Sequence, residues 1–158
     1  MITKPEDGTS NFEGARAFID SPTFKLLVAS SLLARPFVEH IGPERDLTLP
    51  EWRTLVALDA KGALSNIEVS ELTGLDKMTV SRALDRLRGN ERVERARDPA
   101  DGRRQINRMT ASGRATYRAV VKLARQRQEA MGSDLTERDL VVLERTLDRI
   151  IAHLKAVG

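Results

Sequence analysis

Apolar residues recur every three or four positions along most of this 158-residue chain, a spacing that predicts amphipathic helices. The first helix is expected to begin at Ser21-Pro22, because serine caps a helix and proline fits its first turn. Leucine-rich sequence carries this helix towards Ile41, with a kink near Pro36 and an end at Gly42-Pro43. The polar sequence before it, residues 1–20, is expected to be weakly ordered.

Four later helices share one kind of start, at Thr48, Ser65, Asp76 and Thr136. The first two starts are capping boxes with glutamate three residues on, and the last is a variant with aspartate there. Apolar residues flank each cap, so each start also carries the pair that forms a hydrophobic staple. Glycine stands where left-handed residues end such helices, at Gly62, Gly74 and Gly132. The repeated signature predicts a mainly helical fold.

The last predicted helix carries a seam of apolar residues that alternate three and four positions apart. Its members are Leu140, Leu143, Leu147, Ile150, Leu154 and Val157. Such heptad-like spacing is typical of a helix that packs along its length against another helix. The partner helix belongs either to the core of the same chain or to a second copy of the chain, and the two are compatible.

The segment from Ser65 to Thr110 predicts two short helices, a tight turn between them, and a hairpin over residues 92–109. A helix-turn-helix followed by a basic hairpin, or wing, is a device for reading duplex DNA. Apolar residues of the second helix, residues 77–88, must face the core, which leaves its N-terminal edge for the major groove. The candidate DNA contacts in these helices are Ser65, Lys77, Thr79, Ser81, Arg82 and Arg86.

The wing adds three candidates beside its turn-rich tip, residues 98–102. Arg103 follows the tip, where its guanidinium can insert into a narrow minor groove. Asp101 is expected to hold that guanidinium by a charge-assisted pair, and Arg104 is a further candidate contact. The plain alternatives are an ordinary surface helix and a hairpin whose arginines serve solubility.

Charge is concentrated on this segment, although the whole chain carries a net charge of only +3. Between Lys77 and Arg108, ten basic and five acidic residues give +5, which leaves −2 for the rest of the chain. A basic segment on a slightly acidic body is the expected electrostatic footprint of a surface that faces phosphates. On charge alone, a solvated surface is an equally good explanation.

Composition argues against several other classes of function. Aromatic residues make up 4% of the chain and cysteine is absent, which favours an aliphatic helical core and excludes disulfides and thiolate metal sites. Only two histidines occur, and no phosphate-binding loop or nucleophile motif, so no catalytic, metal or cofactor site is expected. No apolar run approaches the roughly 20 residues of a membrane span, so a cytoplasmic protein without a membrane partner is expected.

Three stretches of the segment resemble the MarR (multiple antibiotic resistance regulator) family of winged helix-turn-helix proteins. Residues 101–110, DGRRQINRMT, follow the family's wing pattern of aspartate, any residue, arginine and a strand ending in Leu-Thr, with methionine in place of leucine. Residues 80–82 and 84–87, VSR and LDRL, are similar to the family's recognition helix.

This resemblance implies a ligand-responsive repressor that binds a pseudo-palindromic operator as a homodimer, with the recognition helix in the major groove and the wing in the minor groove. The implied fold is mainly α with a small β-hairpin wing. A winged helix-turn-helix lobe would span residues 47–110, and helical dimerisation regions would span 21–46 and 111–158. One departure concerns Glu91, where the family usually has glycine, so the turn into the wing is expected to be shifted or strained.

In the family, small and often aromatic acids bind between the dimerisation helices and the DNA-binding lobe and weaken DNA binding. The resemblance therefore implies a small aromatic or phenolic effector. Candidate effector-binding residues near the junction of the first and second helices are Arg35, His40, Trp52 and Arg53. Trp52 also has a plain role as the staple partner of Leu47, and His40 as a surface residue.

A winged helix that mediates protein–protein or RNA contacts is the alternative to a DNA-binding regulator. Binding to duplex DNA that weakens steeply with salt separates the two, because each phosphate contact releases a counterion.

Overall fold

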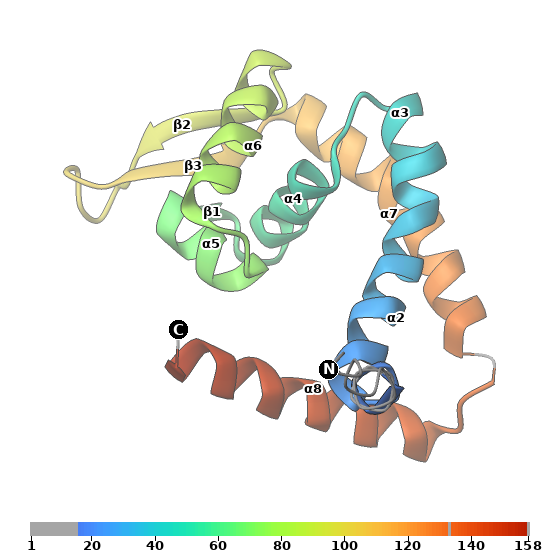
Figure 1. Ribbon diagram of the computed structural model, residues 1–158. Coiled ribbons are helices and arrows are strands. Elements are labelled where there is room, and N and C mark those ends of the chain that lie inside the picture. The colour runs from blue at the N-terminus through green and yellow to red at the C-terminus, as the bar shows by residue number, and fades with distance from the viewer. Residues whose placement is uncertain (1–15, 133, 158) are drawn as a thin grey trace, which may run out of the picture. The chain divides into compact units, whose positions relative to one another are not determined.

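The computed structural model describes residues 16–132 and 134–157 of the chain (Figure 1). They form two compact units that divide between Gly113 and Arg114. Of the segment 1–20 that was expected to be weakly ordered, residues 1–15 lie outside the described residues. Residues 16–19 form a short helical turn.

The first long helix continues further than its sequence predicts. Helix α2 runs over Pro22–Pro36 and is followed without a break by a π-helical turn, η1 (Phe37–Ile41), and a last short turn, α3 (Gly42–Glu44). The irregularity expected at Pro36 is this π-helical turn. The expected end at Gly42-Pro43 is wrong, because Gly42 keeps right-handed helical geometry with φ −61°. Glycine is required there by packing, since a Cβ atom would lie 2.6 Å from the Leu47 carbonyl oxygen.

Three helices of the first unit begin at the caps that the sequence predicts. They are α4 (Leu49–Lys61), α5 (Asn66–Thr73) and α6 (Lys77–Gly89). Both capping boxes are formed, Thr48 with Glu51 and Ser65 with Glu68, and Asp76 accepts the Thr79 N–H at 2.9 Å. The glycines at the ends of α4 and α5 have φ of 84° and 66°, as expected of residues that terminate helices.

The wing hairpin is part of a three-stranded antiparallel sheet. Its strands are β1 (Ala63–Leu64), β2 (Val93–Arg97) and β3 (Gln105–Met109), in the order β1-β3-β2. The sequence predicts the β2–β3 hairpin but not β1, whose two residues are too few to show a strand pattern. The buried Asn107 side chain joins β3 to the helices by donating to the Leu64 carbonyl and the Asn66 side chain, both at 3.0 Å.

The core of the first unit lies between α4, α5, α6 and the sheet. Its fully buried aliphatic side chains are Leu55, Leu58, Val69, Val80, Leu84 and Leu87. Each contributes about 1.5–3 kcal/mol relative to an exposed side chain. The last three are the residues of α6 that the sequence assigns to the core. Their burial fixes which edge of α6 faces outward.

The second unit holds most of α7 (Ala111–Gly132) and all of α8 (Glu137–Val157). The predicted cap of α8 is formed, since Thr136 and Asp139 exchange three hydrogen bonds of 2.6–3.2 Å. No described residue of α8 is buried, and its apolar residues stand exposed. Among the helices of the described residues, none combines the length and the apolar character that crossing a membrane requires.

Candidate nucleic-acid interface

The N-terminal edge of α6 points its polar side chains out of the core. Lys77 and Arg82 are exposed, and Ser81 is half-buried. The Arg82 guanidinium lies 3.3 Å from the sulfur of Met78, a weak contact, and it forms no ion pair with a carboxylate among the described residues. This edge therefore presents two cations and a hydroxyl, the donor set that reads guanine and phosphate oxygens in the major groove.

Thr79 is partly occupied by the helix cap. Its hydroxyl donates to the Asp76 carboxylate at 2.6 Å while its N–H donates to the other oxygen at 2.9 Å. These hydrogen bonds, the hydroxyl's first, lower the pKa of Asp76 below its ordinary value. The Thr79 hydroxyl keeps acceptor capacity and its methyl group for contact with a base.

Ser65 has a structural task that weakens its candidacy as a DNA contact. Its hydroxyl donates to the Glu68 carboxylate at 2.8 Å and accepts the Glu68 N–H at 3.3 Å. Both sides of the hydroxyl are therefore used within the capping box of α5.

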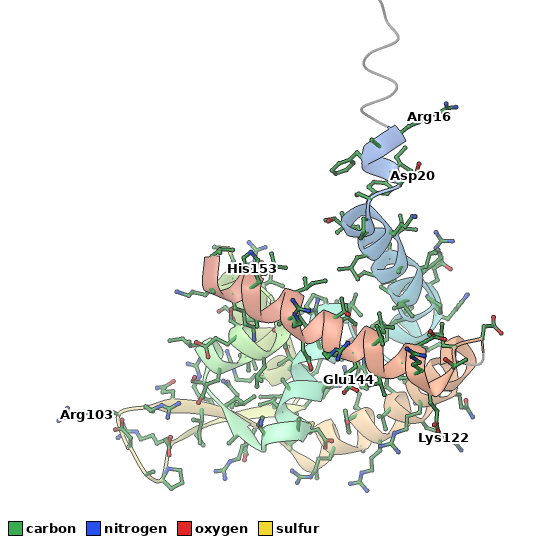
Figure 2. All side chains as sticks on the ribbon, turned by 90° about the horizontal axis from the view of Figure 1, so that it is seen from below. Arg16, Asp20, Arg103, Lys122, Glu144 and His153 are labelled. Atoms are coloured by element: carbon green, nitrogen blue, oxygen red, sulfur yellow. The ribbon has the colours of Figure 1, made fainter. Side chains whose placement is uncertain are left out.

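The wing extends beyond the helices of its unit (Figure 1), with Arg103 pointing outward at its tip (Figure 2). Asp101 accepts the main-chain N–H of Arg103 at 3.0 Å, and the pair with the Arg103 guanidinium that the sequence suggested is not formed. A carboxylate two residues ahead reaches a main-chain N–H within a turn without ordering a long side chain. In the described part of the chain, the Arg103 guanidinium has no carboxylate partner.

Arg104 is held within the lobe rather than directed outward. Its guanidinium lies 3.0 Å from the Glu68 carboxylate on α5 and 3.5 Å from Asp98 across the hairpin. The pKa of Glu68 is lowered by its hydrogen bonds from Ser65 first and then by Arg104, and the pKa of Arg104 is raised chiefly by Glu68. Arg104 therefore tethers the wing to the helix-turn-helix, which the sequence could not show for residues so far apart in the chain.

Arg86, predicted as a direct DNA contact, is also paired with carboxylates of its own lobe. Its Nε atom lies 2.6 Å from Glu51 Oε1, and its Nη2 atom lies 2.9 Å from Asp46 Oδ1. Glu51 is the main cause that raises the pKa of Arg86. The side chain points along the lobe because a buried carboxylate and a loop carboxylate both lie within its reach.

The four effector candidates are not brought together. Trp52 and Arg53 line a cavity of about 400 Å³ between α4 and α5, whose other lining residues are Val56, Ala57, Ala60, Lys61, Leu72 and Thr73. Arg35 and His40 are exposed beside Glu39, each about 4.0 Å from its carboxylate, and do not line this cavity. The Trp52 ring stacks on Phe37 with ring centroids 6.1 Å apart.

Comparison with known protein families shows which proteins this helix-turn-helix and wing resemble. The model of the MarR family matches residues 47–104, the stretch that contains α4, α5, α6 and the first strand and tip of the wing. The chain is 38% identical over 88 residues to the HTH-type transcriptional repressor NicR of Pseudomonas putida. That match covers 55% of this chain and 56% of NicR, so the chain spans about half the length of this curated relative.

Two solved structures extend the similarity over most of the fold. The regulator BpsR of Bordetella bronchiseptica, whose DNA binding is regulated by 6-hydroxynicotinic acid, is 27% identical with a TM-score of 0.73. The similarity covers 84% of this chain and 94% of BpsR. PcaV of Streptomyces coelicolor, solved with its natural ligand, is 29% identical with a TM-score of 0.63, over 81% of this chain and 87% of PcaV.

Proposed function

We propose that this chain, whose residues 47–104 match the MarR family model, is a ligand-responsive transcriptional repressor that binds duplex DNA as a homodimer in the cytoplasm. The observation that carries the proposal is the pair of outward-facing basic elements on one lobe, the N-terminal edge of α6 and the tip of the wing. Burial of the opposite face of α6 fixes the first, and the hairpin presents Arg103 at the second. These two elements supply groove contacts of different kinds.

The proposed DNA contacts are assigned to the side chains that are not already paired within the lobe. Lys77, Ser81 and Arg82, with Thr79 at the cap, are assigned to bases and phosphates of the major groove. Arg103 is assigned to the minor groove, where a narrow A·T-rich stretch attracts a guanidinium. Arg86 and Arg104 are assigned to positioning, because carboxylates of the lobe already pair with them.

The homodimer is supported by the exposed apolar residues of α8 and α2. The proposed dimerisation regions are residues 21–46 and 111–158, and the reading lobe is 47–110. A two-fold dimer presents two recognition helices to half-sites about 34–36 Å apart along the duplex.

A small aromatic acid is the proposed effector, and the cavity between α4 and α5 is its proposed site. The cavity joins apolar walls and the Trp52 ring to the cations Arg53 and Lys61, which suits an aromatic body with one carboxylate. Regulation of BpsR by 6-hydroxynicotinic acid supports this ligand class. Isothermal titration of the purified protein against aromatic carboxylates tests it. If these acids produce no heat of binding and do not weaken DNA binding, the proposed effector class is wrong.

The DNA-binding function is tested by selecting duplexes from a random pool and measuring their affinity at several salt concentrations. We expect a pseudo-palindromic consensus and a log–log salt slope of about −0.9 for each phosphate contacted. A flat salt dependence, or preference for single-stranded RNA, would favour a winged helix that contacts protein or RNA instead.

A further inference from the structure

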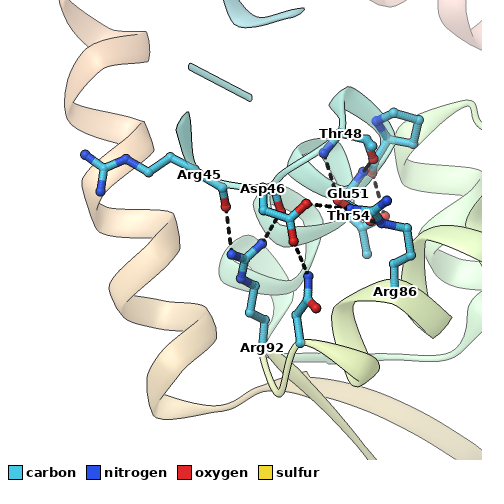
Figure 3. Close-up of polar contacts among 9 residues, drawn as sticks. Arg45, Asp46, Thr48, Glu51, Thr54, Arg86 and Arg92 are labelled. Atoms are coloured by element: carbon cyan, nitrogen blue, oxygen red, sulfur yellow. Dashed lines mark hydrogen bonds and ion pairs between the residues drawn. The ribbon is translucent and has the colours of Figure 1, made fainter. Parts of the chain in front are cut away.

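A polar cluster ties α6 and the start of the wing to the loop before α4 (Figure 3). The loop contributes Arg45 and Asp46, α4 contributes Glu51, and the donors come from Arg86 of α6 and Arg92 next to β2. All five residues belong to the first unit of the chain.

Glu51 serves two helices with its two oxygens. Oε2 accepts the Thr48 N–H at 2.7 Å and completes the capping box of α4. Oε1 is buried, and in the described part of the chain its one polar partner is Arg86 Nε at 2.6 Å. Because Glu51 is 1% exposed, removal of Arg86 would leave a buried charge without compensation.

The loop accepts hydrogen bonds both at the Asp46 carboxylate and at its backbone carbonyls. Asp46 Oδ1 accepts from Arg86 at 2.9 Å, and Oδ2 accepts from Asn90 at 2.9 Å. Arg92 donates to the carbonyl oxygens of Asp46 and Arg45 at 2.6 and 2.7 Å. The C-terminal end of α6 and the first residue of the wing are thereby fixed to one loop.

This arrangement places the anchors at the end of α6 opposite to its reading edge. Lys77 and Arg82 lie in the N-terminal half of the helix, whereas Arg86 and Asn90 lie at its C-terminal end. The core contacts of Val80, Leu84 and Leu87 fix which face of α6 is buried, and the anchors at its C-terminal end contribute to its angle. A change at the loop therefore alters where the reading edge and the wing stand relative to each other.

We propose that Arg86 is a positioning residue which, with Asp46 and Glu51, sets the orientation of the recognition helix and wing for DNA binding. The proposal rests on the proposed function. It predicts that Arg86 affects affinity through the geometry of other contacts, and not by releasing a counterion of its own.

The first test compares the salt dependence of variants on the duplex selected by the wild-type protein. Arg86→Met keeps the apolar stem and removes the bridging charge. We expect about a tenfold or greater loss of affinity with an unchanged salt slope, because badly placed base contacts are lost but no phosphate contact is. Arg82→Met is the matched control on the same helix, and its slope should fall by about 0.9 per protomer.

The second test removes the anchor from the loop without touching a basic residue. Asp46 has φ 44°, a left-handed conformation that glycine adopts freely, so Asp46→Gly keeps the backbone and removes the carboxylate. The variant loses one negative charge, so the net charge of the chain rises by one. By charge alone, this change would tighten DNA binding. Positioning by Asp46 predicts weaker binding instead.

Thermal unfolding verifies that each variant is folded at the temperature of the binding assay. A shallower salt slope for Arg86→Met would make Arg86 a direct phosphate contact and overturn the proposal. Unchanged affinity of the folded Arg86→Met protein, or equal or tighter binding by Asp46→Gly, would also overturn it. If the wild-type chain selects no duplex DNA, the proposed function itself fails first, which is a separate result.

Discussion

At the scale of single residues, the turn from α6 into β2 depends on a strained glutamate. Glu91 has φ 55°, in the left-handed region that glycine occupies at no steric cost. Its carbonyl accepts the Thr110 hydroxyl at 2.7 Å, and its N–H donates to the Arg88 carbonyl at 3.0 Å. The turn is therefore strained at Glu91, which takes a backbone conformation that favours glycine.

Replacement of Glu91 by glycine should relieve this strain. We expect Glu91→Gly to raise the free energy of unfolding by about 1 kcal/mol, because a left-handed residue with a Cβ costs roughly 1–2 kcal/mol. Urea unfolding measures the change. Glu91→Ala is the control and should give no gain from the backbone, since alanine meets the same steric cost. A gain of equal size in both variants would assign the effect to the lost charge.

Gly113 is a second position where the backbone dictates the residue. A Cβ atom there would lie 1.9 Å from the Arg92 carbonyl oxygen, because the first turn of α7 passes against the start of the wing. Gly113→Ala should lower the free energy of unfolding by about 1–3 kcal/mol. Gly102→Ala is the matched control, as nothing lies within 4 Å of its Cβ position. Equal stability of the two variants in urea unfolding would contradict the close approach.

At the scale of elements, the wing is attached to the helices by side chains far from it in sequence. Arg104 pairs with Glu68 on α5, and Asn107 of β3 donates to Leu64 and Asn66. The Arg92 guanidinium holds the other end of the hairpin against the loop before α4. These contacts fix the position of the wing relative to the helices of its unit. Arg103 at the tip takes no part in them, so its guanidinium is available for the proposed contact with DNA.

The wing tether should depend on pH. The folded-state pKa of Glu68 is depressed, chiefly by hydrogen bonds from Ser65 and then by Arg104, so its contribution is present above the ordinary glutamate pKa of about 4.3. That contribution is lost as the pH falls through the lower folded value. The stability difference between wild type and Glu68→Gln in urea should therefore shrink between pH 5 and more acidic solution. Glu71→Gln, exposed on the same helix, is the control, and a pH-independent difference would contradict a stabilising role of the Glu68 carboxylate in the capping box and the tether.

Arg103 should act through the minor groove. Arg103→Ala is expected to weaken binding by roughly 1–3 kcal/mol, and most at duplexes with an A·T-rich flank under the wing, where the narrow groove attracts a guanidinium. Affinity measurements on matched A·T-rich and G·C-rich flanks provide the comparison. Unchanged affinity on both would show that the wing tip makes no contact.

At the scale of the whole molecule, α8 carries an exposed apolar seam. Leu154 is 60% exposed, and Leu140, Leu143 and Ile150 are each about 40% exposed. Contiguous exposed apolar residues at heptad-like spacing favour a second helix as their partner. A second copy of the chain is the partner we propose.

Charges introduced into this seam should prevent dimerisation. For Leu143→Glu with Ile150→Glu we expect a particle close to the 17.6 kDa chain mass, and for the wild type about twice that mass. Size-exclusion chromatography with light scattering distinguishes the two. Arg145→Glu, on the opposite face of α8, should stay dimeric. A wild-type monomer, or a dimeric double variant, would contradict the assignment.

The sequence by itself determined where four helices begin. Caps are local: Thr48, Ser65, Asp76 and Thr136 each bond within three residues, so their pattern is visible in the chain and all four are formed. The apolar spacing in α6 likewise determined its buried face. The resemblance to the MarR family also marked Glu91 as a position where the turn is shifted or strained, and the φ of 55° decides for strain.

Only the tertiary structure decided which arginines are free. Arg86, Arg103 and Arg104 look alike in the sequence, yet Glu51 and Asp46 pair with the first and Glu68 and Asp98 with the last. Local sequence also gave no sign that Gly42 and Gly113 are required by close approach of distant backbone. The physical reason is the same in each case. Charge pairs and steric contacts between residues far apart in the chain depend on distances that only folding sets. The periodicity of helices and strands carries no information about those distances.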